Sequence, residues 1–222
     1  LPISMGSKQT SLFFAEPRNT ATNIEYAIDI PYTILSDNQE YNVKIKEISL
    51  SVNYVYQVVP KIDKDAFLVA EIVNWAELNL LEGKSNIYYQ GTFTSQSIIN
   101  PDQSNDTLSI SLGRDKNVFV KREGRKELSD NKIIGNNVRK TAGWDITLRN
   151  NKTTKIKVII EDQIPISEKK TIAIEHIDLA NAKVDEKKGK LSWVLDLEPN
   201  EKKIITYKYA VKYPKYLTIE LD

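Results

Sequence analysis

His176 is the one histidine of the chain, so it is the first residue to consider for acid–base or metal chemistry. It stands in residues 172–177, where apolar and polar residues alternate as in a β-strand. A catalytic triad needs a nucleophile and an orienting acid beside the histidine, and a zinc site needs further histidines or cysteines. The sequence shows neither pattern, so we expect His176 to be a solvent-facing or turn-adjacent strand residue.

Paired carboxylates are the second candidate, because glycosidases use two of them facing each other across a cleft. Glu161 and Asp162 form one adjacent pair, and Asp185 and Glu186 form another. The chain has 30 acidic residues, so chance neighbours are common. The second pair opens the run Asp-Glu-Lys-Lys-Gly, which is typical of a β-turn with solvated charges.

Metal and phosphate sites have weak support in the sequence. Asp102, Asn105 and Asp106 could ligate calcium through oxygen atoms, but they lack the full spacing of a calcium-binding loop. None of the eight glycines stands in GxGxxG or GxxxxGK[ST], so no phosphate-cradling loop is present. We therefore expect no enzymatic activity, no cofactor, and no catalytic, cofactor-binding or metal-ligating residue.

The chain is rich in tyrosine, with 11 tyrosines that allow two interpretations. Exposed rows of tyrosine bind sugars or partner strands by stacking, whereas tyrosine also simply favours strands and covers sheet faces. The three tryptophans are expected at the core or its edge, and Trp193 is in phase with its apolar neighbours. The tyrosines concerned are Tyr54, Tyr56, Tyr88, Tyr89, Tyr207, Tyr209 and Tyr213, and the other tryptophans are Trp75 and Trp144.

The elements that would position these residues are strands. Residues 154–160, 191–197 and 205–213 each alternate apolar and polar side chains with a period of two, which indicates half-buried antiparallel strands. Turn signals between them favour a sandwich of about seven strands. We predict that its core contains Ile156, Val158, Leu191, Trp193, Leu195, Tyr207 and Val211.

The N-terminal part also has the character of β structure. Residues 66–72 are continuously apolar, as in a strand buried on both faces, and residues 41–59 form a long strand-like stretch whose phase changes near Lys46 and Glu47. Only residues 71–81 leave room for a short helix. We predict an all-β chain of two antiparallel units, with more than about 40% strand and less than about 10% helix. The expected division is an arm at 1–22, a β unit at 23–135 and an immunoglobulin-like β-sandwich at 136–222.

Composition narrows the class of protein. The formal net charge is +1, whereas nucleic-acid-binding domains usually carry a clear basic excess, so we expect no nucleic-acid partner. The chain has no cysteine and no apolar run long enough to span a bilayer. It begins with Leu1, so we expect a fragment of a longer protein.

Several segments taken in order resemble a known family. Among them are Ile87-Tyr88-Tyr89-Gln90-Gly91, Ser111-Leu112-Gly113-Arg114-Asp115, Glu161-Asp162-Gln163-Ile164-Pro165-Ile166-Ser167, Gly189-Lys190-Leu191-Ser192-Trp193 and Leu197-Glu198-Pro199-Asn200-Glu201. Together they resemble the C-terminal domain of the mucoidy-inhibitor-A-like family from about residue 23 onward. The family's Pro-Gly turns survive only in part, at Leu81-Glu82-Gly83 and Pro199-Asn200-Glu201. The resemblance implies no catalytic residues, an upstream coiled coil that could drive oligomerisation, and export to the bacterial cell envelope, periplasmic or surface-exposed.

These observations lead to an expected function. The first hypothesis is a non-catalytic bacterial cell-envelope module that acts through protein–protein contact or scaffolding. The alternative is a β-sandwich domain that binds a glycan or peptide through exposed tyrosines or a sheet edge. The expected partner is thus a protein or an envelope glycan. A hydrolase would need two facing carboxylates, at least one of them strongly perturbed.

Overall fold

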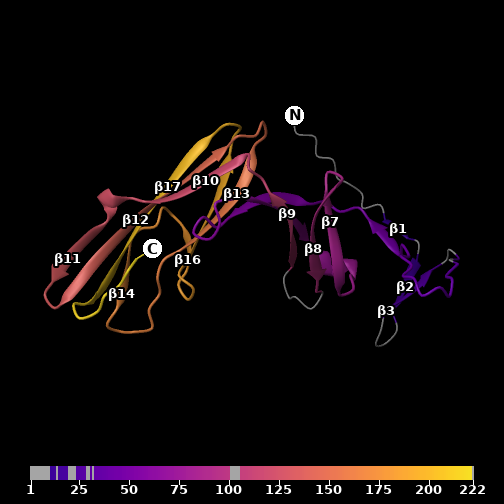
Figure 1. Cartoon of the computed structure of the whole chain (residues 1–222), viewed down its shortest axis with the longest axis horizontal. Helices are drawn as coiled ribbons and strands as arrows, with labels where there is room; N and C mark the ends of the chain where they lie inside the picture. Colours follow the sequence, from indigo (N-terminus) through magenta and orange to yellow (C-terminus); the bar gives the residue numbers. More distant parts are fainter. Residues whose placement is uncertain are drawn as a thin grey trace. The chain divides into compact units, whose positions relative to one another are not determined.

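The computed structural model describes residues 11–13, 15–19, 24–28, 31, 33–100 and 106–221 (Figure 1). Strands make up more than half of the described residues, and the helical content of this part is limited to single 3-10 turns. The predicted all-β class is therefore confirmed. By its contacts the chain divides into one unit at residues 1–52 and another at residues 53–222.

Among its described residues, the first unit has two pairs of short antiparallel strands. β1 (Ser11–Phe13) pairs with β4 (Lys46–Ile48), and β2 (Ala15–Asn19) pairs with β3 (Ile24–Ile28). The stretch at 41–59 is not one strand, because β4 and β5 (Asn53–Val58) are separate elements of different units. Its change of phase therefore needs no bulge within a continuous strand.

The second unit is built from two main sheets. In the five-stranded sheet the strands follow the order β10 (Val118–Gly124), β12 (Asn137–Asn150), β17 (Lys202–Pro214), β14 (Ala173–Asp178), and β11 (Asp130–Ile134) also pairs with β12. The six-stranded sheet has the order β15 (Lys183–Asp185), β16 (Lys190–Leu197), β13 (Ile156–Gln163), β5, β6 (Phe67–Val73), β9 (Thr107–Arg114). Its strands pair antiparallel except β13 and β5, which are parallel.

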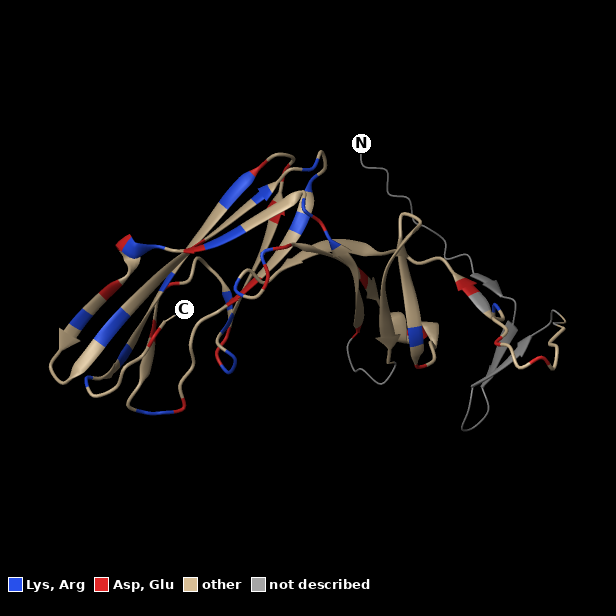
Figure 2. Cartoon of the chain, viewed as in Figure 1, with Lys and Arg blue, Asp and Glu red and all other residues tan. Residues whose placement is uncertain are grey.

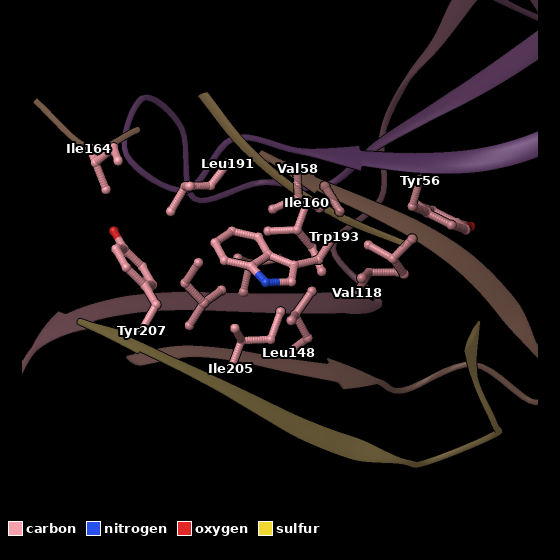
Figure 3. Close-up of a cluster of buried hydrophobic side chains, with 14 of the residues drawn as sticks. Tyr56, Val58, Val118, Leu148, Ile160, Ile164, Leu191, Trp193, Ile205 and Tyr207 are labelled. Atoms are coloured by element: carbon pink, nitrogen blue, oxygen red, sulfur yellow. The ribbon is translucent and has the colours of Figure 1, made fainter. Parts of the chain in front are cut away.

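Side chains from both sheets form one hydrophobic cluster. The Trp193 indole lies among apolar side chains from both sheets (Figure 3), and only 5% of Trp193 is exposed. Six of the seven predicted core residues are buried, and Leu195 packs against the cluster while partly buried. The alternation of apolar and polar residues predicts these core positions correctly because successive side chains of a strand point to opposite faces of the sheet.

The expected boundary near residue 135 falls inside this unit. β10 precedes residue 135 and pairs along its length with β12, which follows it. β5 likewise pairs with β13, and Tyr56, Val58 and Val118 belong to the same cluster as Trp193. The sandwich is therefore not made by residues 136–222 alone, since earlier strands complete both sheets.

A hairpin and two single 3-10 turns complete the described part of the second unit. β7 (Gly83–Tyr89) and β8 (Thr92–Ile99) form a hairpin that contacts β9 (Figure 1), and the short helix allowed at 71–81 is the single turn η1 (Trp75–Leu78). A second turn, η2 (Lys126–Leu128), covers the middle of β12. Gly143 is needed there because a Cβ at this position would overlap the Leu128 side chain.

Candidate functional site

The most concentrated polar chemistry of the second unit lies between the two main sheets. Arg122 of β10 donates from Nε to Oδ2 of Asp162 on β13 at 2.8 Å. The Asp162 side chain is 0% exposed, and its Oδ1 accepts the backbone N–H of Gln163 at 2.8 Å. Because β10 and β13 belong to different sheets, this buried ion pair joins the two layers.

Two aromatic residues complete the surroundings of Arg122. The guanidinium donates to the Tyr207 hydroxyl at 3.1 Å and lies 3.5 Å from the centre of the Trp144 ring. Burial disfavours the charged guanidinium, but the hydrogen bond and the charge of Asp162 outweigh this effect and raise the pKa of Arg122. Burial also raises the pKa of Tyr207 far above its ordinary value. Arg122 thus stays charged and Tyr207 stays neutral at physiological pH. Their hydrogen bonds hold the two sheets together and leave neither group free to act as a base or nucleophile.

A second polar cluster lies beside the turn between β9 and β10. Asp115 Oδ2 accepts hydrogen bonds from the Tyr56 hydroxyl at 2.8 Å and from Lys152 Nζ at 2.6 Å. Burial would raise the pKa of Asp115, but these bonds and the backbone N–H of Asn117 lower it to about 2. Burial, with the bond to Asp115, raises the pKa of Tyr56 to about 12. In this cluster too, the charged groups of Asp115 and Lys152 are bound to each other.

His176 lies on β14 with an exposed side chain. Its Nδ1 is 3.8 Å from Oε1 of Glu186, which is itself largely exposed. This is the solvent-facing strand position that the sequence predicts. The structure brings no hydroxyl nucleophile to His176 among its described hydrogen bonds.

The two carboxylate pairs do not face each other across a cleft. Glu161 and Asp162 point to opposite faces of β13, and Glu161 binds Lys190 at 2.9 Å while Asp162 binds Arg122. Both line a hollow of about 430 Å³, but their oxygens already have cationic partners. Asp185 accepts the backbone N–H groups of the turn that follows it, as expected for a β-turn. The geometry of a glycosidase is therefore not formed by these pairs.

The structure does not bring the candidate calcium ligands together among the residues that it describes. Asp102 and Asn105 lie outside the described residues, and Asp106 is exposed in the bend immediately before β9. Within the described part of the chain, no three acidic or histidine side chains come together as a metal site.

The tyrosines separate into two groups. Tyr207, Tyr209 and Tyr213 are buried in the main cluster with Tyr56, so in β17 tyrosine serves the core. Trp75 and Trp193 are buried and Trp144 is half-buried. Tyr88, by contrast, is 63% exposed on the β7–β8 hairpin. Of the two interpretations of the tyrosines, covering a sheet face holds for those of β17, whereas an exposed aromatic surface lies on the hairpin.

The outward face of the hairpin carries that surface. Tyr88 lies opposite Phe93, which is 51% exposed, and the two rings meet edge to face with centroids 5.7 Å apart. Two positions along the strand, Gln96 donates to Asn86 at 3.0 Å, and the exposed Ile98 follows on the same face. Lys84 is the one charged residue between residues 83 and 99, as the almost uniformly tan hairpin in Figure 2 shows.

A hollow of about 580 Å³ lies between the hairpin and the end of β9. Its lining is mainly hydroxyl and amide side chains, joined by one aromatic and one cationic residue. Thr94 donates to the Ile87 carbonyl oxygen, and Arg114 binds Asp63 and Asp65 at 3.0 and 2.8 Å. The lining residues are Phe67, Ile87, Thr94, Ser95, Gln96, Ser97, Ser111, Gly113 and Arg114.

The sequence also contains a signal for the buried ion pair. Asp162 is in phase with the buried Ile160 on β13, and Arg122 is in phase with the buried Val120 on β10. Opposite charges at core positions of two strands predict a buried pair, since an isolated buried charge is very costly. The hairpin has a weaker signal in the sequence, namely Tyr88 within a segment that is poor in charge, and whether that tyrosine is exposed depends on how β7 and β8 pack.

Comparison with known proteins shows to which family the chain belongs. The model of a family described as a domain of unknown function (DUF4139) matches residues 4–215. The chain belongs to this family. Among curated proteins, Protein F37C4.5 of Caenorhabditis elegans is 24% identical over 231 residues, which cover 96% of the chain and 41% of that protein. The chain thus spans less than half of that relative's length.

No solved structure matched the chain. Among the residues that the structure describes, there is also no helix with the length and hydrophobicity needed to span a bilayer. The chain thus combines membership of the DUF4139 family with an all-β fold.

Proposed function

We propose that this DUF4139 domain is a non-catalytic module that acts through protein–protein contact or scaffolding, with the outward face of the β7–β8 hairpin as its contact surface. The observation that carries the proposal is the exposed pair Tyr88 and Phe93 on a hairpin almost free of charge. Aromatic side chains are enriched at protein interfaces and charged ones are depleted at interface centres. Ile98 extends the apolar part of this face.

A non-catalytic role is supported by how the polar residues are used. Enzyme active sites usually hold groups whose pKa values are shifted and which remain free to react. Here the groups with the strongest shifts, in the Arg122 and Asp115 clusters, are tied into buried links between strands and loops.

The setting of the protein is a further part of the proposal. The resemblance to mucoidy-inhibitor-A-like proteins supports a bacterial cell-envelope location and an upstream coiled coil that could make the full-length protein oligomeric. Trp193 between the two sheets supports an immunoglobulin-like sandwich, where a tryptophan commonly fills the core.

The second candidate function is binding of a glycan or peptide by the same face. The Asn86–Gln96 amide pair lies next to the aromatic pair, and sugars are bound by such a combination of stacking and hydrogen-bonding groups. The hydroxyl-rich hollow beside β9 would extend this site.

The experiment is photo-cross-linking of the full-length protein in cells that carry it naturally. A photoreactive phenylalanine analogue replaces Phe93, and a matched variant carries it at Ile133, an exposed residue of β11. We expect a discrete protein adduct from position 93 that is lost on adding Tyr88→Ser and does not form from position 133. Equal adducts from both positions would contradict a contact surface on the hairpin. The second candidate, glycan binding, would be favoured by a different pair of results: no protein adduct forms from position 93, and the protein binds a glycan array in a way that Tyr88→Ser abolishes.

A further inference from the structure

The outer face of the five-stranded sheet carries an unusual row of residues. Phe119 of β10, Arg149 of β12 and Lys202 of β17 are direct neighbours in register, and all three side chains are exposed. Like charges directly opposite each other on a sheet are destabilising. Arg149 and Lys202 therefore face each other at a cost to stability.

Acidic side chains on the same face do not relieve this repulsion. Glu123 binds Lys121 at 2.7 Å, and Asp145 accepts from Thr206 at 2.6 Å and lies 3.6 Å from Arg125. Within the described part of the chain, neither Arg149 nor Lys202 has an ion pair or a side-chain hydrogen bond. Lys and Arg residues recur along β10, β12 and β17, as the blue segments of Figure 2 show.

The row lies in a shallow hollow that could receive a ligand. The hollow has a volume of about 370 Å³ and combines two unpaired cations with an exposed aromatic ring and with amide and hydroxyl groups. It is lined by Phe119, Lys121, Glu123, Thr147, Arg149, Asn151 and Lys202. Beside it, β10 is a terminal strand that pairs with β12 alone among the described strands, so one backbone edge of β10 is open.

We infer that this hollow binds an extended acidic segment of a partner protein. An arginine fork binds a carboxylate through two parallel hydrogen bonds, and Lys202 adds a second charge one strand away. The open edge of β10 offers backbone groups to an extended chain, whose alternate side chains would point toward Phe119 and Lys121. This site does not involve the hairpin, so either surface can fail without the other.

The test measures binding of a fluorescently labelled oligoglutamate peptide to the full chain by anisotropy at low ionic strength. The double variant Arg149→Gln with Lys202→Gln is compared with Lys169→Gln with Lys170→Gln, which removes the same charge from an exposed loop. We expect the first variant to weaken binding at least about tenfold and the second to change it less than about twofold. Equal weakening by both variants, or no binding by the unmodified chain, overturns the inference.

Two further measurements sharpen the result. The melting temperature of the Arg149→Gln with Lys202→Gln variant should equal or exceed that of the unmodified chain, because the substitution removes repulsion; a marked fall would show a structural role and overturn the inference. Polygalacturonate serves as a carbohydrate polyanion. If it binds through Arg149 and Lys202 more tightly than oligoglutamate does, the assignment to an acidic protein segment is overturned.

Discussion

The sandwich core and the β7–β8 hairpin use similar residues in opposite ways. In the core, the Tyr207 ring packs at a tilt against Trp193, with ring centres 5.6 Å apart, and its hydroxyl accepts a hydrogen bond from Arg122. On the hairpin, Tyr88 and Phe93 pack only edge to face and remain more than half exposed. The difference shows that residue type alone does not mark a binding surface; the faces on which the residues lie decide their role.

The two regions also differ in how their polar groups are satisfied. In the core region, each charged group has a partner on a distant strand or loop, as in Arg122 with Asp162 and Lys152 with Asp115. Removing one partner therefore leaves the other charge without its counter-ion. The amide pair Asn86 and Gln96 lies in solvent, where water can replace either partner. Substitutions should therefore be costly in the first region and nearly neutral in the second.

The largest expected loss of stability is from Trp193→Ala. The indole is buried between the sheets, and its Nε1 donates to the carbonyl oxygens of Leu179 and Ala180 at 3.2 and 3.0 Å. Truncating it should lower the free energy of unfolding by about 3–5 kcal/mol. Urea denaturation measures this, and a change below about 1 kcal/mol would contradict the core role.

Breaking the inter-sheet ion pair comes next. Asp162→Leu leaves the Arg122 guanidinium buried without its counter-ion and should destabilise the chain by about 3–4 kcal/mol. The double variant Arg122→Met with Asp162→Leu removes both charges and should recover most of that loss. If the double variant is as unstable as the single one, packing and not charge accounts for the effect.

Asn150 tests a fully buried polar link between loops. Its Nδ2 donates to the carbonyl oxygens of Thr154, Leu197 and Glu198, and its Oδ1 accepts the backbone N–H of Lys152. Asn150→Ala should cost about 2–3 kcal/mol because these buried groups lose their partner. Asn151→Ala is the matched control at the exposed neighbour and should change the unfolding free energy by less than about 0.5 kcal/mol.

The Asp115 cluster should give a measurable acid dependence. The folded-state pKa is about 2 against an ordinary value of 3.8, so the contribution to stability is present above the ordinary value and is lost as pH falls toward 2. With the exposed part of the group taken into account, the loss should be about 1–2 kcal/mol. Unfolding curves measured at a series of pH values give the free energy of unfolding of both proteins. This free energy should fall less steeply with decreasing pH in Asp115→Asn than in the unmodified chain, and an equal fall in both would contradict the role of Asp115.

The smallest effect on stability is expected on the hairpin. Tyr88→Ser with Phe93→Ser removes exposed rings and should change the free energy of unfolding by no more than about 1 kcal/mol, including the loss of their mutual contact. The same variant should lose the cross-linked partner or the bound glycan. A large loss of stability would show that this pair serves the fold, and the contrast between the regions would disappear.

The sequence by itself determined the all-β class and much of the core. Alternation is a local property of the chain, so Val158, Leu191 and Tyr207 could be assigned to a buried face without knowing their partners. It also indicated correctly that His176 is a solvent-facing strand residue and that Asp185 begins a turn.

Only the tertiary structure decided which segments belong together. Pairing of β10 with β12 and of β5 with β13 joins residues far apart in sequence, and this places the expected boundary near residue 135 inside one unit. Arg122 reaches Asp162, and Arg149 meets Lys202, because strand register brings them together. Register depends on long-range pairing, for which local patterns of hydrophobicity carry no partner information.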